Sequence, residues 1–349
     1  MFFKNLIITG GAGFIGNNFI RYILKKNIEF NKLFIIDKLS YASHKNNIKD
    51  LLDDKRIFFY KVDICAKSTL NKTMQEIIKI AGGTEKLAII HFAAETHNDN
   101  SIDNPPPFVQ TNILGTYNLI EIARHNHMRF HHISTDEVFG DLPLNALPKN
   151  QKFTDSSPYL PSSPYSATKA SSDLLVRAWT RTFGLKATIS NCGNNYGPYQ
   201  HIEKFIPRQI TSILENKKPK IYGNGLNVRD WIHVDDHSSA ILSILNKGKI
   251  GRTYLIGVNG QKNNLEVIKI ILQVMNKPSN WFDFVKDRDG HDLRYAIDPS
   301  KTMNELGWKP SHLNLKEEIK SVVEWYANNP WFWKHQKEKV EQMYKNRGQ

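Results

Sequence analysis

Short apolar runs alternate with longer segments of helical period along the first half of the chain. The runs are rich in Ile, Leu and Phe, which is typical of strands buried on both faces. The segments between them place apolar residues three and four apart, as an amphipathic helix does. We expect strands at residues 4–8, 33–36, 56–62, 87–92 and 130–134. We expect helices at about residues 14–26, 68–80 and 108–126.

Strand-then-helix units in series predict an α/β fold with an open, doubly wound parallel sheet of the Rossmann type. A further helix is expected from residue 164 to about 183 and a sixth strand at 187–192. After that, helices and irregular segments dominate, with strand-like returns at 231–234 and 253–256. We therefore expect a smaller, mostly α-helical lobe. The predicted division assigns residues 1–193 and a return segment at about 229–260 to the sheet domain. It assigns residues 194–228 and 261–349 to the smaller lobe, with residues 331–349 forming a helix that ends in a solvated, partly frayed tail.

Composition narrows the class of protein. The 349 residues exceed one ordinary core and are 40% hydrophobic, as a folded protein of two lobes requires. The formal net charge of +13 comes mainly from Lys scattered along the chain, so we expect a solvated surface and no nucleic-acid partner. The two cysteines, Cys65 and Cys192, form no metal spacing or disulfide framework. With no signal-like or membrane-spanning run, we expect a cytoplasmic protein without membrane association.

A glycine-rich turn separates the first expected strand from the first helix and reads TGGAGFIG at 9–16. Glycines let the backbone approach a pyrophosphate, which the helix N-terminus then binds. The second strand ends in Asp37, 21 positions after Gly16, where a ribose-binding carboxylate is expected. A carboxylate at this position repels a 2′-phosphate. The sequence therefore predicts that the sheet domain binds NAD rather than NADP, and a plain strand–helix turn is the alternative.

Polar and small residues follow the other expected strands. Asp63 follows the third strand, Ala93-Ala94 the fourth, and Thr135-Asp136-Glu137 the fifth. The carboxyl ends of parallel strands share one edge, so these residues should meet in one crevice. Adjacent carboxylates whose pKa values are driven apart can serve as an acid and a base. The alternative is an exposed Asp-Glu pair at a helix start, where acids suit the helix dipole.

Tyr165 and Lys169 are four residues apart at the start of an expected helix, so they share one helix face. An ammonium beside a phenol favours the phenolate. A tyrosine so tuned can take a proton from a hydroxyl while a nicotinamide accepts hydride from the same carbon. Thr135 can hydrogen-bond the same hydroxyl. The glycine-rich turn earlier in the chain strengthens the interpretation of Tyr165 and Lys169 as a catalytic pair.

With these motifs the chain resembles the nucleotide-sugar 4,6-dehydratases of the extended short-chain dehydrogenase/reductase superfamily. The resemblance runs from Ile7 to about Trp325. Its broad marks are the glycine-rich turn and Tyr165-x-x-x-Lys169. Its narrower marks are FAAETH at 92–97, STDEVFG at 134–140, NNYGPYQ at 194–200, VRDW at 228–231 and DRDGH at 287–291. The adjacent Asp-Glu distinguishes dehydratases from epimerases of the same fold.

The resemblance implies an NAD-dependent hydro-lyase. A nucleoside-diphosphate glucose would be oxidised at C4, lose water across C5 and C6, and be reduced at C6, with tightly bound NAD regenerated each turnover. We expect dTDP-glucose as substrate, and UDP-glucose remains open. Alternatives are an epimerase or decarboxylase of this fold, or a non-catalytic NAD-bound binding protein. The resemblance also implies a homodimer and a place in deoxysugar biosynthesis, such as the dTDP-rhamnose pathway.

The resemblance assigns roles residue by residue. The expected catalytic residues are Thr135, Asp136, Glu137, Tyr165 and Lys169. The expected NAD contacts are Gly10, Gly13, Phe14, Ile15, Gly16, Asp37, Lys38, Ser40, Asp63, Ile64, Phe92, Ala93, Ala94, Thr96, Thr111, Tyr165, Lys169 and Asn195. The expected substrate contacts are Thr96, Thr135, Asn194, Lys204, Phe205, Lys220, Tyr222, Arg229, Asn264, Arg288 and His291. No metal is expected.

Five positions depart from the usual pattern of the family. Thr96 keeps the hydroxyl of the usual Ser, whereas Phe139 loses the phenol of the usual Tyr. Asn98 and Gly193 differ from the commoner residues, and Asp289 replaces the usual Pro. Asp289 would add a negative charge near the expected diphosphate, which bears on substrate affinity or on the choice of nucleotide.

Overall fold

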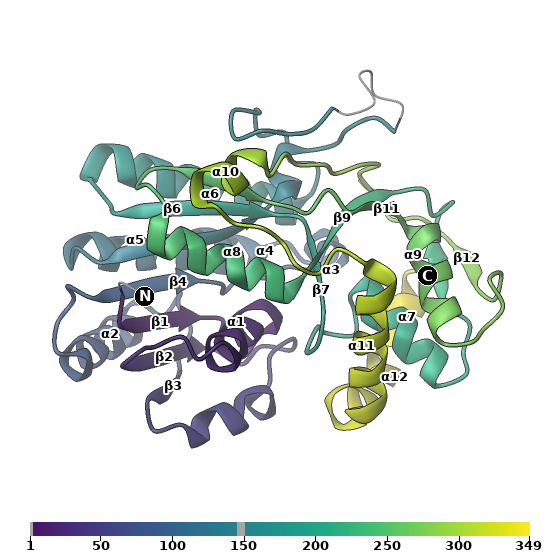
Figure 1. The fold of residues 1–349 in the computed structure, drawn as a ribbon, viewed down its shortest axis with the longest axis horizontal. Coiled ribbons are helices and arrows are strands. Elements are labelled where there is room, and N and C mark those ends of the chain that lie inside the picture. The colour runs from purple at the N-terminus through teal and green to yellow at the C-terminus, as the bar shows by residue number, and fades with distance from the viewer. Residues whose placement is uncertain (1–2, 145–150) are drawn as a thin grey trace.

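The computed structural model describes residues 3–144 and 151–349. Its main feature is a seven-stranded parallel sheet in the order β10-β6-β5-β4-β1-β2-β3 (Figure 1). Successive strands run outward in both directions from β1, so the sheet is doubly wound and the prediction is confirmed. Its strands are β1 (Asn5–Thr9), β2 (Lys32–Asp37), β3 (Ile57–Lys61), β4 (Leu87–His91), β5 (Arg129–Thr135), β6 (Ala187–Cys192) and β10 (Thr253–Ile256).

Helices cover both faces of this sheet. Strand side chains alternate between faces, so Ile7 of β1 packs with α2, α5 and α6, whereas Leu6 and Ile8 pack with α1 and α8. Each apolar run therefore feeds two cores at once, which explains why it is hydrophobic at every position. The helices around the large sheet are α1 (Phe14–Lys25), α2 (Lys67–Ala81), α3 (Asn98–Asp103), α4 (Pro106–Phe108), α5 (Thr116–His125), α6 (Pro164–Phe183), α8 (Val234–Lys247) and α10 (Ser300–Leu306). Short 3₁₀ turns span Lys45–Ile48, Asp50–Asp53 and Asp136–Phe139.

The helix expected at 108–126 is present, but it is not uniform. Between α4 and α5 the chain forms a π-helical stretch, Val109–Gly115. A Cβ at Gly115 would lie 2.5 Å from Ile64 Cδ1, so glycine permits close packing there. Asn112 Nδ2 donates to Glu95 O at 3.0 Å and to Thr168 Oγ1 at 2.9 Å. The stretch therefore joins the loop after β4 to α6.

A second core lies beyond the carboxyl ends of the large sheet (Figure 1). It is built mainly from α7 (Phe205–Leu214), α9 (Asn264–Val274), α11 (Leu315–Asn328) and α12 (Pro330–Asn346). Two small sheets accompany these helices: β11 (Gln261–Asn263), β9 (Val228–His233) and β7 (Asn194–Tyr196), and β12 (Asp283–Val285) with β8 (Lys220–Tyr222). The chain also returns to the large sheet at α10, which packs on β10 and α8. The predicted domain boundaries do not include this return and stay a prediction.

The expected frayed tail at the end of the chain is wrong. Helix α12 buries Phe332, Trp333 and Tyr344 in the second core. Beyond the helix, Gln349 is 6% exposed and its Oε1 accepts a hydrogen bond from Tyr222 OH at 3.1 Å. Aromatic residues at helical spacing form the buried face. Most charged residues of the segment are exposed, but Lys337 is 2% exposed and pairs with Glu341.

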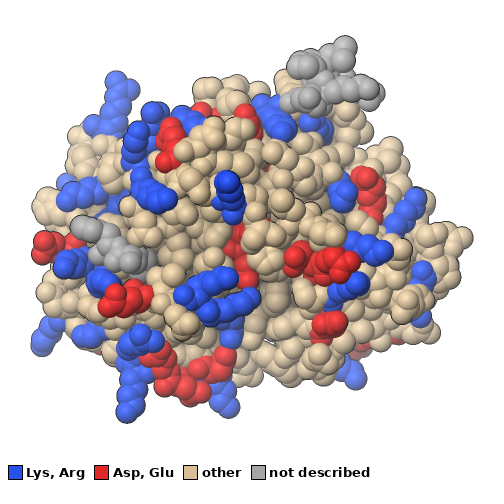
Figure 2. Space-filling model, viewed as in Figure 1, with Lys and Arg blue, Asp and Glu red and all other residues tan. Residues whose placement is uncertain are grey.

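Charge is mixed over the surface that Figure 2 shows, where Lys and Arg side chains are interspersed with Asp and Glu. This agrees with the scattered lysines of the sequence. Within residues 3–144 and 151–349, no helix is both long and apolar enough to cross a membrane.

Candidate active site

Two cavities lie side by side at the carboxyl ends of the sheet strands. The first, of about 260 Å³, is lined by the glycine-rich turn and the ends of β2, β4, β5 and β6. The second, of about 140 Å³, is lined by residues of α3 and of the segments around the second core. The residues that border both cavities are Thr96, Glu137, Asn194, Glu203 and Lys204. Glu137, the expected base, therefore lies where the two cavities meet.

The glycine-rich turn leaves an anion-binding helix end open to the first cavity. Gly13 is the N-cap of α1 and provides no side-chain cap, so the first-turn N–H groups stay free for a phosphate. A Cβ at Gly16 would lie 2.5 Å from Gly10 O, and one at Gly10 would lie 2.7 Å from the Ala93 backbone. Larger residues at these two positions would collide with backbone atoms and distort the glycine-rich turn, which with the N-terminus of α1 forms the phosphate cradle.

Asp37 lies at the end of β2, beside this cradle. Its Oδ1 accepts from Leu39 N and Ser43 Oγ, whereas its Oδ2 accepts only from Ala12 N at 3.0 Å among the described residues. A carboxylate oxygen has two lone pairs, so Oδ2 can still accept from a ribose hydroxyl. The cradle and this acid together fit a dinucleotide without a 2′-phosphate, that is, NAD.

All but one of the expected NAD contacts line the first cavity. Those that do are Gly10, Gly13, Phe14, Ile15, Gly16, Asp37, Lys38, Ser40, Ile64, Phe92, Ala93, Ala94, Thr96, Thr111, Tyr165, Lys169 and Asn195. Asp63 is the exception. Its Oδ1 accepts a hydrogen bond from Cys65 N at 2.8 Å, so its carboxylate holds the turn before α2, while its neighbours Val62 and Ile64 line the cavity.

Strand β5 and the 3₁₀ turn that follows it place Thr135, Asp136 and Glu137 in the lining of the first cavity. Thr135 caps the 3₁₀ turn that follows, since its Oγ1 accepts from Glu137 N at 3.3 Å. Asp136 is 1% exposed, and its Oδ2 has no hydrogen-bond partner among the described residues. A buried polar atom without a partner is costly, so Asp136 Oδ2 is suited to a ligand group.

The two adjacent carboxylates lie in different surroundings. Burial, and then the charge of Glu137, raise the pKa of Asp136 well above its usual range. This favours the protonated acid at Asp136. Glu137 is only partly buried and faces both cavities, and Asn98 Nδ2 donates to its Oε2 at 2.7 Å. The pair therefore offers a proton donor at the buried Asp136 and, at Glu137, a carboxyl group that faces both cavities.

Tyr165 and Lys169 reach the first cavity from the first turns of α6. Lys169 Nζ donates to Ile133 O at 2.8 Å, and burial lowers the pKa of Lys169 to about 8. The expected lowering of the Tyr165 pKa is not found: burial, followed by the charge of Glu137, raises the pKa of Tyr165 well above its usual range. The chain alone therefore keeps the phenol protonated, and a phenolate requires a further positive charge nearby.

A buried carboxylate under this pair escaped the sequence reasoning. Asp173 Oδ2 accepts hydrogen bonds from Ser134 Oγ, Tyr159 OH and Asn191 Nδ2. His132 Nε2 also lies 3.2 Å from Asp173 Oδ1. It thus fixes α6 to the ends of β5 and β6. The signal was available, since Asp173 follows Lys169 at the same four-residue spacing at which Lys169 follows Tyr165.

The second cavity has an excess of positive charge. Its lining includes five Lys and Arg side chains and three Asp and Glu side chains, so a diphosphate would find a net cationic wall. Lys204 Nζ donates to Thr96 O at 2.7 Å, and Arg229 Nη2 donates to Asp292 O at 2.9 Å. These hydrogen bonds fix the orientation of both cationic side chains. The cationic lining residues are Lys204, Arg208, Lys220, Arg229 and Arg288.

The expected substrate contacts lie around this second cavity, except Thr135, which lines the first. Those in the second are Thr96, Asn194, Lys204, Phe205, Lys220, Tyr222, Arg229, Asn264, Arg288 and His291. The sequence reasoning did not assign Asp99, Arg208, Trp231, Tyr295 or Tyr344, which also line it.

Two of the unusual residues have a structural account. Phe139 is buried and stacks on Phe153 with 5.3 Å between ring centroids, so an apolar pocket replaces the partner that a phenol would need. Asp289 is exposed and does not line the second cavity. Its charge therefore stays outside the lining of the diphosphate site that we expect.

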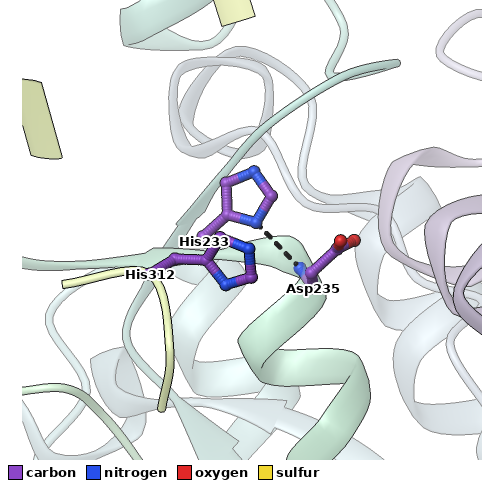
Figure 3. A group of neighbouring side chains, drawn as sticks. All are labelled: His233, Asp235 and His312. Carbon is purple, nitrogen blue, oxygen red and sulfur yellow. Dashed lines mark hydrogen bonds between the residues drawn. The ribbon is translucent and has the colours of Figure 1, made fainter. Parts of the chain in front are cut away.

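One group of possible metal ligands occurs among the described residues, and it lies outside both cavities: His233, Asp235 and His312 (Figure 3). The two imidazole rings stack with 4.5 Å between centroids, so their in-plane lone pairs do not converge. His233 Nδ1 accepts from Asp235 N at 3.2 Å, while the Asp235 carboxylate pairs with Lys25. These contacts cap α8 and indicate a structural role.

Comparison with known proteins agrees with this geometry. The family model described as GDP-mannose 4,6 dehydratase matches residues 7–322. The chain belongs to this family. It is 48% identical to the dTDP-glucose 4,6-dehydratase of Mycobacterium tuberculosis strain H37Rv over 344 residues, which cover 99% of each chain. It is 43% identical to dTDP-glucose 4,6-dehydratase 1 of Escherichia coli strain K12, with 93% of each chain covered.

Solved structures show the same fold. DesIV, the dTDP-glucose 4,6-dehydratase of Streptomyces venezuelae with NAD and TYD bound, is similar with a TM-score of 0.87 and 38% identity. That match covers 95% of this chain and 99% of DesIV. The UDP-glucose 4-epimerase of Thermus thermophilus in complex with NAD gives a TM-score of 0.80 at 24% identity over 92% of this chain and 98% of that chain, which shows the fold alone.

Proposed function

We propose that this protein is an NAD-dependent dTDP-glucose 4,6-dehydratase, a hydro-lyase that converts dTDP-glucose to dTDP-4-keto-6-deoxyglucose and water. The observation that carries the proposal is the position of Glu137 where the two cavities meet, with Asp136, Tyr165 and Lys169 beside it in the lining of the first cavity. Relatives of that name share 48% identity over nearly the whole chain, which supports the choice of reaction.

The first cavity holds the cofactor. The glycine-rich turn and the N-terminus of α1 take the pyrophosphate, and Asp37 accepts from the ribose. When bound, NAD would supply a cationic hydride acceptor for the oxidation at sugar C4 and a hydride donor for the reduction at C6. The chain must therefore keep the cofactor in place throughout a turnover.

Thr135 and Tyr165 act at the C4 hydroxyl. Thr135 orients the hydroxyl, and Tyr165 takes its proton as C4 becomes a ketone. Because the surrounding carboxylates and burial oppose the phenolate, the Lys169 ammonium and the positive charge of the cofactor must favour it. Lys169 is fixed for this purpose by its bond to Ile133 O.

Asp136 and Glu137 act at C5 and C6. The C4 ketone acidifies the C5 proton, and Glu137 removes it as base. The electron pair of the C5–H bond forms the C5–C6 double bond while the C6–O bond breaks. Asp136, held protonated by its burial, donates its proton to the departing oxygen, which leaves as water. Glu137 then returns a proton to C5.

The second cavity holds the nucleoside diphosphate. Its cationic lining suits the phosphate oxygens, and Asn194, Lys204 and Glu137 bring the sugar to the border with the first cavity. UDP-glucose has the same diphosphate and sugar, so the alternative concerns only the nucleoside. Comparing kcat/KM for dTDP-glucose and UDP-glucose separates the two substrates.

The experiment for the proposed function is incubation of the purified protein with dTDP-glucose. We expect a product that absorbs in alkali as a 4-keto sugar, together with water loss in its mass. A product of unchanged mass would indicate an epimerase. Carbon dioxide release from a nucleoside-diphosphate glucuronate would indicate a decarboxylase, and absence of turnover with any nucleoside-diphosphate glucose or glucuronate a binding protein.

We also infer a homodimer and a role in deoxysugar biosynthesis. On α6, Leu174 and Phe183 are 54% and 51% exposed, and Val109 and Leu114 of the neighbouring π-helical stretch are also exposed. These apolar residues suit a surface that pairs with a second copy, and light scattering of the purified protein tests it. The keto-deoxy product is a precursor for deoxysugars such as dTDP-rhamnose, in the cytoplasm.

A further inference from the structure

Asn98 is the first residue of α3 and is 9% exposed. Its Nδ2 donates to Glu137 Oε2 at 2.7 Å, and its Oδ1 accepts from Ser163 Oγ at 2.8 Å. A carboxylate can only accept, so the amide nitrogen must face Glu137. The two partners therefore fix the orientation of the amide, with its nitrogen toward Glu137 and its oxygen toward Ser163.

The Ser163 contact connects this amide to the helix that carries Tyr165. Ser163 is the N-cap of α6 and forms a capping box with Ser166. A second connection runs through Ser101, whose Oγ donates to Asn98 O at 2.7 Å and accepts from Tyr165 N at 3.2 Å. Asn98 therefore holds Glu137 in a fixed position relative to the first turn of α6.

We propose that Asn98 is a positioning residue for the C5 proton transfer, which holds the Glu137 carboxyl group at the border between the two cavities by its hydrogen bond. This inference rests on the proposed function, because it assumes that Glu137 removes the C5 proton. In that step the C5–H bond breaks, the proton passes to the Glu137 oxygen, and the electron pair forms the double bond as water leaves C6. Asn98 lines the second cavity beside Glu137 and acts on this step through its hydrogen bond to Glu137.

The chemistry of the contact gives a specific expectation. A hydrogen bond donated to the charged form of an acid favours that form. Without Asn98, the Glu137 carboxyl group loses this donor. Loss of Asn98 should therefore move the acidic limb of the pH profile upward. A merely structural role would lower the rate equally at every pH.

The test compares Asn98→Leu and Asn98→Asp with the wild type. Leu has nearly the shape of Asn without its polar atoms, and Asp keeps the acceptor for Ser163 but adds a negative charge beside Glu137. Asn104→Asp is the matched control: it adds the same charge at the exposed end of α3. Three quantities are measured across pH: kcat and KM with dTDP-glucose, the rate of C5 proton exchange in deuterated water, and the rate of C4 oxidation.

We expect Asn98→Asp to slow C5 exchange by about 10- to 100-fold near neutral pH and to recover at higher pH, as loss of general-base function predicts. Its acidic limb should lie about one pH unit or more above that of the wild type. The acidic limb of Asn98→Leu should also lie at a higher pH than that of the wild type, by a smaller amount. C4 oxidation should change far less than C5 exchange in either variant, because the Asn98 side chain contacts Glu137 and the loss is confined to the step that Glu137 performs. Asn104→Asp should match the wild type.

Two results would overturn the inference: C5 exchange that is unaltered in both Asn98 variants, or a loss that is equal at every pH. Should Asn98→Asp fail to fold, Asn98→Leu and Ser163→Ala decide the matter. Ser163→Ala frees the amide to rotate and should produce a smaller shift of the same sign. Failure of the proposed function is distinguishable, because the wild type would then form no 4-keto-6-deoxy product.

Discussion

Lys169 Nζ donates a hydrogen bond to the backbone carbonyl of Ile133 at 2.8 Å. The contact joins α6 to β5 two residues before Thr135, so the helix that carries Tyr165 and the strand that carries the acid–base pair are held together inside the first cavity. Buried Asp173 reinforces the same junction through Ser134 and Asn191. The residues proposed for C4 oxidation and for elimination thus share one rigid support.

Replacing Lys169 by Met should slow C4 oxidation by about 10- to 100-fold, because the ammonium that favours the Tyr165 phenolate is lost. The pKa of Lys169 is lowered to about 8, so the wild-type rate of oxidation should decline above this pH while the variant lacks that decline. Stopped-flow absorbance of reduced nicotinamide measures the step. The exposed Lys339→Met serves as control, and an unaltered rate in Lys169→Met would remove the assigned role.

Tyr165→Phe should reduce C4 oxidation by about 10²- to 10⁴-fold, the usual contribution of a positioned base. The ring remains to fill its buried site, so folding should be preserved. Tyr60→Phe is a suitable control, because it removes a phenol that bonds only to surface Glu76 in the described structure. Single-turnover formation of reduced cofactor at the wild-type rate would contradict the assignment.

Glu137→Gln should permit C4 oxidation and block loss of water. The amide has nearly the shape of the carboxylate but cannot take the C5 proton. Reduced cofactor and a 4-keto sugar that retains its C6 hydroxyl should accumulate on the enzyme, as mass spectrometry of the quenched reaction would show. The exposed Glu338→Gln controls for the substitution. Formation of the 6-deoxy product by Glu137→Gln at the normal rate would refute the base assignment.

Tyr344→Phe should weaken substrate binding, because α12 forms part of the second cavity. Tyr344 OH donates to Glu203 O at 2.6 Å and lies 3.1 Å from His97 Nε2. Removal of the hydroxyl should lower the free energy of unfolding by about 1 kcal/mol and raise KM for dTDP-glucose more than it lowers kcat. Urea titration and steady-state kinetics measure both. An unaltered KM would show that α12 only supports the fold.

His312 should make stability depend on pH. Its Nδ1 lies 3.0 Å from Asp236 Oδ1, and this hydrogen bond raises the pKa of His312. The folded state therefore binds the His312 proton more tightly than the unfolded state does. The resulting stabilisation is complete below about pH 6.5, the ordinary histidine value, and is lost as pH rises through the raised folded value.

The neighbours of His312 do not reverse this sign. Burial lowers the pKa of stacked His233 to about 4, and the pKa of Asp236 is also lowered, so neither group titrates near or above pH 6.5. Asp235 and Glu318 add negative charge that favours the His312 cation. Urea unfolding of His312→Asn should lack the wild-type loss of stability over this range. An identical pH dependence in the variant would show that another group is responsible.

The sheet was predictable because its signals are local. Apolar runs, the turn at Gly10 to Gly16 and the acid Asp37 each report on their own neighbourhood, and the shared edge of a parallel sheet brings them together. Contacts between distant segments were not predictable in this way. Asn98 and Glu137 are 39 positions apart. The hydrogen bond between Tyr222 and Gln349 depends on how α12 packs.

The pKa of Tyr165 also depends on distant segments and could not be predicted from the local sequence. Spacing along a helix correctly placed Tyr165 and Lys169 on one face, but it carried no information about Glu137 and Asp136, which approach from β5 and oppose the phenolate. The final segment failed for a related reason, since its charge content concealed a buried aromatic face. Burial is a property of the assembled fold, and it determined both the pKa of Tyr165 and the packing of the final segment.

The measurement that tests the central claim most directly follows two isotopes at once. dTDP-glucose carrying deuterium at C4 is converted in ordinary water, and unlabelled substrate is converted in deuterated water. The account predicts that the C4 label appears at C6 of the same 4-keto-6-deoxy product, and that solvent deuterium appears at C5. Loss of the C4 label to solvent, or a product without solvent deuterium at C5, would contradict it.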